Sequence, residues 1–440
     1  MKKTLYAPVT GVLKSRCCQS VIAFLVLFSG LQSLPLLAAK NDKSLTLGAA
    51  ISRTIQQNPT LKVFEFRDAA MQGQMQSADL KPALELGVET ENFAGSNELS
   101  GFDSAELTVS LSSVIELGSK REARTGFVSR NRSLLAVEKQ LQSLDLLGEV
   151  TRRYIDVLAA QERVGLAMEA AELSNIALDV VKKRARVGST PEAEVKRASA
   201  AAAQSALTLM SERRQLQYLK VALAMLWGEK NPGFSKVEGD LYQFGESIDF
   251  NSLYAKVAQN PAVQIFAAQE RLQDAEVRLA KTESTANLSW SVGLRQLQES
   301  NDTALVAGFS MPLFSGKRNK GAVVTALAER NEIFVQKKIA LLEIYTQLFR
   351  AFNNRQQAVD SVKRLQSEIV PALEQALEET QQAYQRGRYS YLEYVGARQE
   401  TLSARRTLIE AASAALMFGA TIEQLTAEPL TLSPQKKSLK

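Results

Sequence analysis

The chain has 440 residues with 53 Lys and Arg, 47 Asp and Glu, two cysteines and no histidine. The lack of histidine excludes Ser–His–Asp catalysis and histidine-based zinc sites, and no local pattern supports another catalytic group or a cofactor, so we do not expect an enzyme. Cys17 and Cys18 lie close to the N-terminus, which leaves no thiol for a disulfide or a metal site in the rest of the chain.

The N-terminus predicts a secretory signal peptide over residues 1–39. Four basic residues precede the apolar run "VIAFLVLFSGLQSLPLLAA" at 21–39. A membrane anchor is the alternative, but Gln32, Ser33 and Pro35 interrupt the run short of the ~20 apolar residues that a spanning helix needs. Because the leader has four basic residues and no acid, its removal lowers the net charge from +6 to +2, which argues little for nucleic acid as a partner.

One short motif occurs twice, 202 residues apart. "IQQNPTLKVFEF" begins at residue 55 and "VAQNPAVQIFAA" at residue 257, so that Asn58-Pro59 corresponds to Asn260-Pro261. In each copy the motif precedes two alternating segments and then a very long helical pattern. The sequence therefore predicts two internal repeats, 40–241 and 242–440. The second repeat includes a C-terminal tail, which we expect to lie in solvent, as chain ends usually do.

The alternating segments predict two strand hairpins, at about 83–114 and 287–314. In the first segment Leu84, Leu86 and Val88 alternate with polar residues or glycine. Each segment is about ten residues long, which is the length of a transmembrane β-strand with apolar side chains outward and polar side chains inward. A half-buried strand of a soluble sheet has the same period and remains an alternative. The four segments are 83–93, 105–114, 287–296 and 304–314.

The helical patterns predict two helix hairpins, at about 123–228 and 321–424. Apolar or small residues in the segment 321–386 alternate at steps of four and three, a heptad seam that extends about 99 Å if the helix is continuous. Pro371 either bends this helix or begins a new turn. "GSTP" at 188–191 predicts a helix end at Gly188, a hydroxyl cap and a proline at the first helical position, and "GRYS" at 387–390 predicts a similar Gly turn and cap.

Four strands cannot close a membrane barrel, and unpaired strand edges are not tolerated in lipid, so the strands predict an oligomer. Two copies give eight strands with an interior filled by side chains, whereas three give twelve strands and a lumen. The helices would then continue the barrel as a coiled-coil tube. The polar face expected to line a water-filled lumen contains Glu85, Glu89, Glu106, Ser110, Ser289 and Arg295.

With this organisation the chain resembles the TolC-like outer-membrane efflux proteins over nearly all of residues 45–425. "ETENFAG" (89–95) and "ELGSKREAR" (116–124) are most similar to the CzcC and CusC type of heavy-metal efflux, with Ser119 in place of a usual glycine. The resemblance implies an α+β membrane protein: a trimeric twelve-strand outer-membrane β-barrel, four strands per chain, continued by a long periplasmic α-helical coiled-coil barrel.

The same resemblance implies a passive exit duct in the cell outer membrane that extends into the periplasm. The implied partners are two further copies of the chain, outer-membrane lipid, a periplasmic adaptor protein and an inner-membrane resistance-nodulation-division pump, with metal cations as the expected substrates. An outer duct for drug efflux or type I protein secretion is one alternative. A non-channel periplasmic coiled-coil structural protein is another.

Members of this family close their tube at the periplasmic tip, and the resemblance implies that Glu194, Tyr384 and Glu393 belong to this gate. Tyr389 stands where the family has a latch arginine, so Arg386 or Arg388 is expected to substitute. Three copies of Glu194 and Glu393 at a narrow tip would favour cations over anions. Ser390-x-x-Glu393 is also a capping box, so Glu393 can either cap its helix or line the pore, and the two roles are compatible. Glu194 has the better claim to the gate, because it lies beyond the predicted Ser189–Glu192 box.

Overall fold

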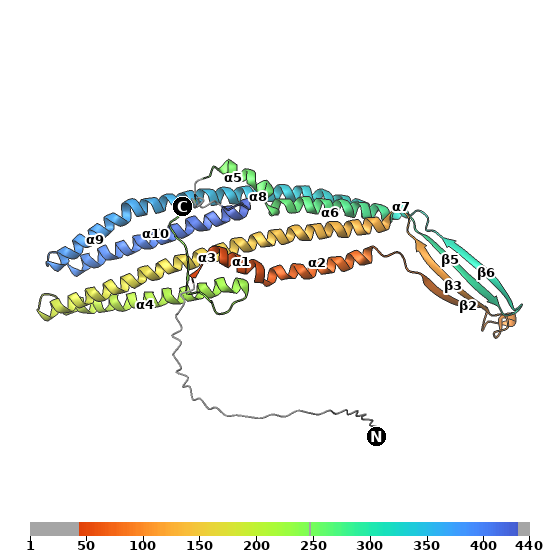
Figure 1. The fold of residues 1–440 in the computed structure, drawn as a ribbon, viewed down its shortest axis with the longest axis horizontal. Coiled ribbons are helices and arrows are strands. Elements are labelled where there is room, and N and C mark those ends of the chain that lie inside the picture. Colours follow the sequence, from red (N-terminus) through yellow and green to blue (C-terminus); the bar gives the residue numbers. More distant parts are fainter. Residues whose placement is uncertain (1–43, 246–247, 430–440) are drawn as a thin grey trace, which may run out of the picture. The chain divides into compact units, whose positions relative to one another are not determined.

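A computed structural model describes residues 44–245 and 248–429 (Figure 1). The predicted signal peptide and the last residues of the C-terminal tail lie outside the described residues. The first half of the chain contains β1 (Ser44–Leu45), α1 (Leu47–Gln57), α2 (Pro59–Ala78), β2 (Glu85–Glu91), η1 (Asn97–Leu99), β3 (Glu106–Ile115), α3 (Lys120–Arg186), α4 (Glu192–Ala224), η2 (Met225–Trp227) and β4 (Lys236–Val237).

The longer elements of the second half follow in a similar order, with two helices, two strands and a helix hairpin. They are α5 (Phe250–Lys256), η3 (Val257–Gln259), α6 (Pro261–Glu283), β5 (Leu288–Leu297), β6 (Asp302–Ser310), α7 (Ser315–Arg318), α8 (Lys320–Arg364), a π-helical turn (Leu365–Ile369), α9 (Val370–Gln385) and α10 (Tyr391–Thr426).

Each Asn-Pro pair begins a helix and ties it to a distant segment. Asn58 is the N-cap of α2, where its Oδ1 accepts a hydrogen bond from the Thr60 N–H (2.8 Å), and Pro59 occupies the first turn, where no N–H is needed. The Asn58 Nδ2 donates to the Leu226 carbonyl (2.7 Å). Asn260 caps α6 in the same way and donates to two carbonyls near the end of α10 (both 2.8 Å). The motif therefore fixes the start of one helix to the end of another in both halves.

Strands β2, β3, β5 and β6 form one antiparallel sheet in that order, so the two halves pair directly through β3 and β5. The register places Glu89, Thr108 and Arg295 side by side on the polar face. The opposite face is apolar and exposed, with Leu86 73% and Phe309 74% accessible. This segregation is the one expected of a strand surface that meets lipid on one side and water on the other.

Small residues on the polar face let the strand backbones approach closely. A Cβ atom placed on Gly293 would lie 2.6 Å from the Val109 carbonyl oxygen, and one on Gly308 would lie 2.9 Å from the Ser291 Oγ. Glycine at these two positions therefore leaves room for the neighbouring strand and for the serine side chain on the polar face.

The two long helical predictions are confirmed as helices, with one interruption. α3 has 67 residues and is about 100 Å long at 1.5 Å per residue. The predicted segment 321–386 is α8 and α9 joined by the five-residue π-helical turn, which ends just before Pro371. Proline has no N–H to donate, and the wider turn before it accommodates that missing bond without ending the helix.

Two boundaries differ from the prediction. α4 begins at Glu192, and its N-cap is Pro191, which makes no side-chain capping bond, so the predicted hydroxyl cap and Ser189–Glu192 box are wrong. Pro191 occupies the cap because its extended ψ of 147° places it just outside the helix. β6 ends at Ser310 rather than near 314, because Pro312 cannot donate to the strand ladder.

A mixed core forms where α1, α3, α4 and the short parallel pair β1–β4 meet. Tyr154 on α3 is central to it: its hydroxyl hydrogen-bonds the carbonyls of Leu45 (2.8 Å) and Glu238. Burial raises the pKa of this phenol to about 12. The segments that precede α1 and follow α4 are thereby held on the same helix.

Helix α10 is the one helix within the described ranges that is long and apolar enough to span a membrane. It packs against α3, α8 and α9. Contact with these helices accounts for its apolar composition.

Candidate channel gate and lumen

The turns of the two helix hairpins are joined by a small apolar core. The first hairpin is α3–α4 and the second is α9–α10, and their turns lie at the same end of the helices (Figure 1). Residues from α3, α4, α9 and α10 all contribute to this core. Its buried members are Ala177, Val181, Ala198, Tyr384, Tyr391 and Tyr394.

Tyr384, the predicted gating tyrosine, is at the centre of this core and is only 3% exposed. Its ring stacks on Tyr394 with centroids 5.6 Å apart and lies 6.1 Å from the ring of Tyr391. Burial raises the pKa of all three phenols, so they stay protonated at neutral pH. The Tyr384 hydroxyl is buried and has no hydrogen-bond partner within the described part of the chain.

Arg184 in the last turn of α3 joins the first hairpin to Tyr384. Its guanidinium carbon lies 4.7 Å from the centre of the Tyr384 ring, and its Nη1 donates to the Tyr384 carbonyl oxygen (2.6 Å). One cation thus makes a cation–π contact and a charged hydrogen bond to the same residue of the second hairpin. Sequence reasoning missed Arg184. Arg184 lies in the last helical turn before Gly188, much as Arg386 precedes Gly387, and this parallel could have indicated it as a gate candidate.

Glu194 lies in the first turn of α4 and is half-buried beside the tyrosine core. Its negative charge contributes to the raised pKa of Tyr384 and of Tyr391, after the larger effect of burial. The structure therefore brings together two of the predicted gate residues, Glu194 and Tyr384, through the packing of the two hairpins.

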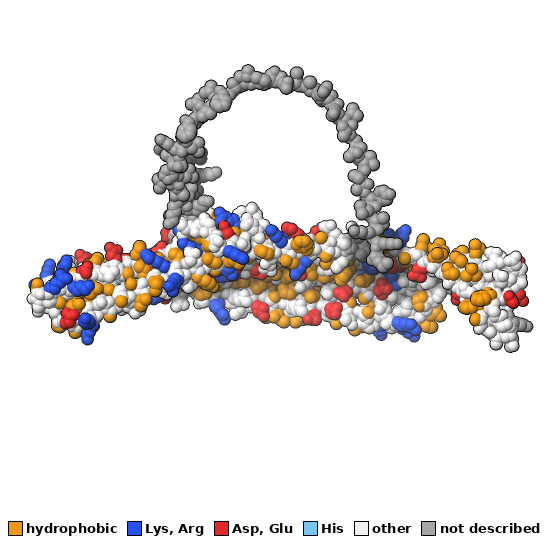
Figure 2. Space-filling model, turned by 90° about the horizontal axis from the view of Figure 1, so that it is seen from below, with side chains coloured by type: hydrophobic (Ala, Val, Ile, Leu, Met, Phe, Trp, Pro, Cys, Tyr) orange, Lys and Arg blue, Asp and Glu red, His pale blue; other side chains and the backbone are white. Residues whose placement is uncertain are grey.

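The other predicted gate residues lie in or next to the exposed α9–α10 turn. Arg386, Arg388 and Tyr389 are all exposed, and their side chains make no hydrogen bond or ion pair with another described residue of this chain. Figure 2 shows Lys and Arg side chains gathered over this end of the hairpins. Within the described residues of one chain, the arginine that bonds to Tyr384 is Arg184, and a role of Arg386 or Arg388 in the gate stays a prediction.

Glu393 forms the predicted capping box at the start of α10. The Ser390 N–H donates to the Glu393 Oε2 (2.6 Å), and the Glu393 N–H donates to the Ser390 Oγ (3.3 Å). The two bonds that Ser390 donates to the carboxylate, from its N–H and from its Oγ (2.8 Å), hold the pKa of the Glu393 carboxyl below its usual range. The carboxylate is exposed, which leaves it free to face another molecule while it caps the helix.

Arg398 is a buried cation that the sequence did not single out. It is 6% exposed, and its Nε and Nη1 have no hydrogen-bond partner among the residues of 44–245 and 248–429. It lies on the same face of α10 as Tyr391 and Tyr394, at spacings of seven and four residues. That spacing is the signal by which the sequence could have placed it in the core.

An ion-pair cluster crosses the polar face of the sheet. Arg295 on β5 bonds to Glu106 on β3 (2.7 Å), to Glu91 on β2 (2.9 Å) and to the Thr108 hydroxyl (3.0 Å). The register thus brings together the predicted lumen residues Glu106 and Arg295. Glu91 was missed, although it continues the alternation of Glu85 and Glu89, which are exposed on the same face.

Comparisons with known proteins agree with this architecture. The profile of the outer membrane efflux protein family matches residues 50–229 and 253–428. The chain is 25% identical over 383 residues, 87% of this chain and 88% of the relative, to the cobalt-zinc-cadmium resistance protein CzcC of Cupriavidus metallidurans. It is 23% identical over 354 residues, 73% of this chain and 72% of the relative, to the pyoverdine export outer membrane protein OpmQ of Pseudomonas putida.

A solved structure has a similar fold. Crystal structures of CusC, concerned with folding and transmembrane channel formation, give a TM-score of 0.71 at 16% identity. The match covers 86% of this chain and 91% of the CusC chain. At this identity the likeness supports the fold alone.

Proposed function

Because this chain belongs to the outer membrane efflux protein family, we propose that three copies of it form the exit duct of a tripartite efflux system. The protein is an outer-membrane channel protein that extends into the periplasm. Its partners in the proposed system are a periplasmic adaptor and an inner-membrane resistance-nodulation-division pump, which supplies the energy for transport. The duct itself works passively.

The four-stranded sheet, with one apolar and one polar face, is the observation that carries this proposal. Its apolar face is exposed, and its outer strands β2 and β6 each have one edge without a partner strand among the described residues. Open strand edges are not stable in lipid, so further copies must supply the missing strands. Three copies give twelve strands and leave a lumen, whereas two would give a barrel filled by its own side chains.

The helices also present an apolar surface that a second copy can cover. Exposed apolar side chains recur along α8 at helical spacing, with Leu342 62% accessible. Such a stripe on a single chain favours a helix–helix interface between copies. Its members are Val324, Leu327, Phe334, Val335, Ile339, Leu342, Tyr345 and Phe349. The order of elements, helices then strands then helices in each half, supports the two proposed repeats of residues 40–241 and 242–440.

Metal cations are the proposed cargo. On the polar face of the sheet, five carboxylates accompany one guanidinium, that of Arg295, so three copies would enclose a strongly negative lumen. The carboxylates are Glu85, Glu89, Glu91, Glu106 and Asp302. Similarity to a cobalt-zinc-cadmium resistance protein supports the same cargo. At the tip, exposed arginines stand beside the predicted acids, so the cation preference rests on the strand lumen rather than on the tip.

Planar-bilayer conductance of the detergent-purified trimer tests this function. We expect small cation-selective steps, and a lower selectivity in Glu85→Gln/Glu89→Gln, whose carboxylates make no ion pair with a described residue that neutralisation would disturb. Glu192→Gln, an exposed acid in the first turn of α4, is the matched control and should leave selectivity unchanged. A trimer that shows no conductance in any preparation would refute the duct.

Two alternatives are separated by other observations. The first alternative is a duct for another cargo, which includes drugs and secreted proteins. The similarity to a pyoverdine export protein favours this alternative. Deletion strains that lose tolerance to metal salts but not to organic compounds would decide for metals. The non-channel coiled-coil protein is contradicted by the family membership, because the whole matched region is that of an efflux channel.

A further inference from the structure

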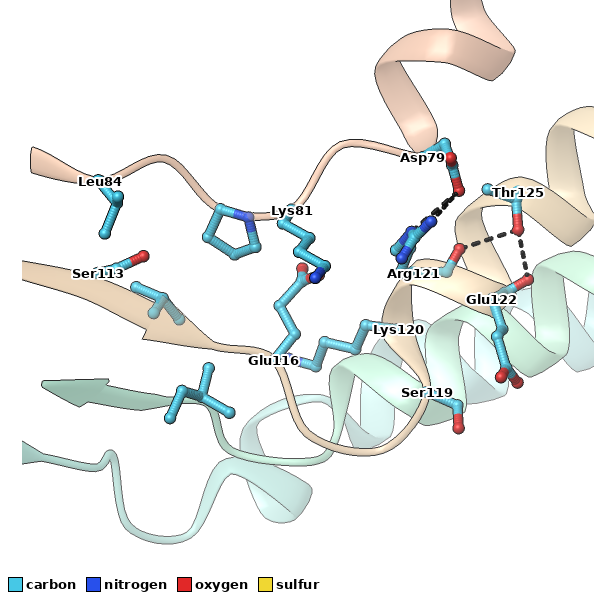
Figure 3. A pocket seen from close by; sticks show the side chains of 13 residues that line it. Asp79, Lys81, Leu84, Ser113, Glu116, Ser119, Lys120, Arg121, Glu122 and Thr125 are labelled. Atoms are coloured by element: carbon cyan, nitrogen blue, oxygen red, sulfur yellow. Dashed lines mark hydrogen bonds and ion pairs between the residues drawn. The ribbon is translucent and has the colours of Figure 1, made fainter.

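A cavity of about 840 Å³ lies at the junction between the sheet and the helices (Figure 3). The segment between α2 and β2 forms one wall, the end of β3 forms another, and the first turns of α3 form the third. Figure 3 shows Lys81 on the connecting segment, Leu84 and Ser113 on the strand side, and Arg121 and Glu122 on α3. None of these residues belongs to the gate or to the lumen.

The cavity opens on the apolar face of the sheet. Leu84 and Ile115 both line it, and they are 65% and 46% exposed. By the alternation of the strands they point to the same side as Leu86 and Leu111, which belong to the face proposed to meet lipid. A lipid whose chains cover this face would therefore reach the cavity with its headgroup.

Most charged groups around the cavity are already paired within the chain. Arg121 bonds to Asp79 (2.7 Å), and Lys120, only 4% exposed, bonds to Glu283 (3.2 Å). Lys81 is the exception on this wall: it is exposed, and its ammonium group makes no hydrogen bond or ion pair with another described residue. Its ammonium group is free to bind an anion that enters the cavity.

The charges of the lining are balanced. Three acids and three bases line the cavity, and they are Asp79, Glu116, Glu122, Lys81, Lys120 and Arg121. A headgroup that carries one negative and one positive charge matches this balance better than a purely anionic one. In Figure 3 the Glu116 side chain points toward Lys81, whereas Asp79 lies beside Arg121. Asp79 pairs with Arg121 and Glu116 with Arg124, but each carboxylate keeps oxygen lone pairs that can accept a further hydrogen bond from an ammonium group.

We propose that this cavity binds the headgroup of a membrane phospholipid with a zwitterionic phosphoethanolamine group, with the phosphodiester on Lys81 and the ammonium toward Asp79 and Glu116. The acyl chains then lie over Leu84 and Ile115 on the apolar face. This inference rests on the proposed function, because it needs the sheet to be in a membrane. The lipid holds the sheet-to-helix junction at the level of the headgroups.

Native mass spectrometry of the purified trimer tests the site. Delipidated trimer is mixed with phosphatidylethanolamine, phosphatidylglycerol or inorganic phosphate, and the retained adducts are counted. We expect retained phosphatidylethanolamine and about ten-fold weaker retention in Lys81→Gln, which loses one charged hydrogen bond. Lys81→Arg should retain the lipid, and Lys62→Gln, an exposed lysine on α2, is the matched control.

Each other outcome overturns the inference. Equal or stronger retention of phosphatidylglycerol would refute the zwitterionic headgroup, and displacement by inorganic phosphate would refute a lipid site. Absence of any retained lipid, or equal loss in Lys62→Gln, would also refute it. The conductance of the same trimers separates this failure from failure of the duct. Trimers that conduct but retain no lipid refute only the lipid site, whereas the absence of conducting trimers refutes the proposed function.

Discussion

Arg184→Met removes the hydrogen bond and cation–π contact that join the last turn of α3 to Tyr384 of the second helix hairpin. The cation–π contact at 4.7 Å is worth about 0.5–1 kcal/mol at a partly exposed site. The charged hydrogen bond to the Tyr384 carbonyl is worth about 1.5 kcal/mol. Methionine keeps an apolar stem, so we expect a loss of about 2 kcal/mol per protomer, which multiplies the population with the contact broken roughly thirty-fold.

The assay is the open probability of single trimers in planar bilayers. If separation of the two hairpins opens the tip, Arg184→Met should raise open probability without changing the conductance of the open state. Arg186→Met is the control, because Arg186 is in the same helical turn, is exposed, and contacts no other described residue. Equal open probabilities for wild type, Arg184→Met and Arg186→Met would refute the reasoning that this contact holds the tip closed.

Three further predictions concern stability and assembly. Ser119 has a left-handed backbone (φ 57°), so Ser119→Gly should raise the free energy of unfolding by about 0.5–1 kcal/mol, measured by denaturant, whereas Ser129→Gly within α3 should lower it. Gly293→Val places a side chain against the Val109 carbonyl and should reduce the trimer fraction in size-exclusion chromatography, whereas Gly73→Ala, with nothing within 4 Å, should not. The lowered pKa of Glu393 means that its stabilisation of α10 is present above its ordinary value of 4.5 and is lost as pH falls through the lower folded value. Amide protection in the first turn of α10, measured relative to the unfolded chain at the same pH, should therefore fall in acid, and a flat pH profile that matches Glu393→Gln would contradict this.

Local sequence determines the elements of this fold but not all of their ends. The alternation of Leu84, Leu86 and Val88 predicts β2 because side chains of a strand point to opposite faces at every step. The predicted cap at Ser189 is wrong because Pro191 takes the cap position itself, a choice set by the geometry of the whole turn. Likewise Pro371 predicts an irregularity in the helix, but only the packing around it determines that this irregularity is a π-helical turn rather than a helix end.

The candidate site is less predictable, since its contacts join segments far apart in the sequence. Glu106 and Arg295 are 189 residues apart, and alternation shows their common face but not their register. The contact between Arg184 and Tyr384 spans 200 residues and depends on how the two hairpins pack. The capping box of Glu393 is predictable because all its atoms lie within four residues.

The magnitude of the tip contacts bears on how a passive duct can be opened. Three Arg184 contacts of about 2 kcal/mol each amount to about 6 kcal/mol, close to the ~5.5 kcal/mol needed to move a two-state equilibrium from 1:99 to 99:1. A partner that binds the open tip more tightly by this amount can supply it without energy from the duct. The side chains of Arg386 and Arg388 are open to such binding, because they are exposed and make no hydrogen bond or ion pair with another described residue. A partner that docked on Arg386 and Arg388 would therefore not compete for the Arg184 contact that the proposed opening must break.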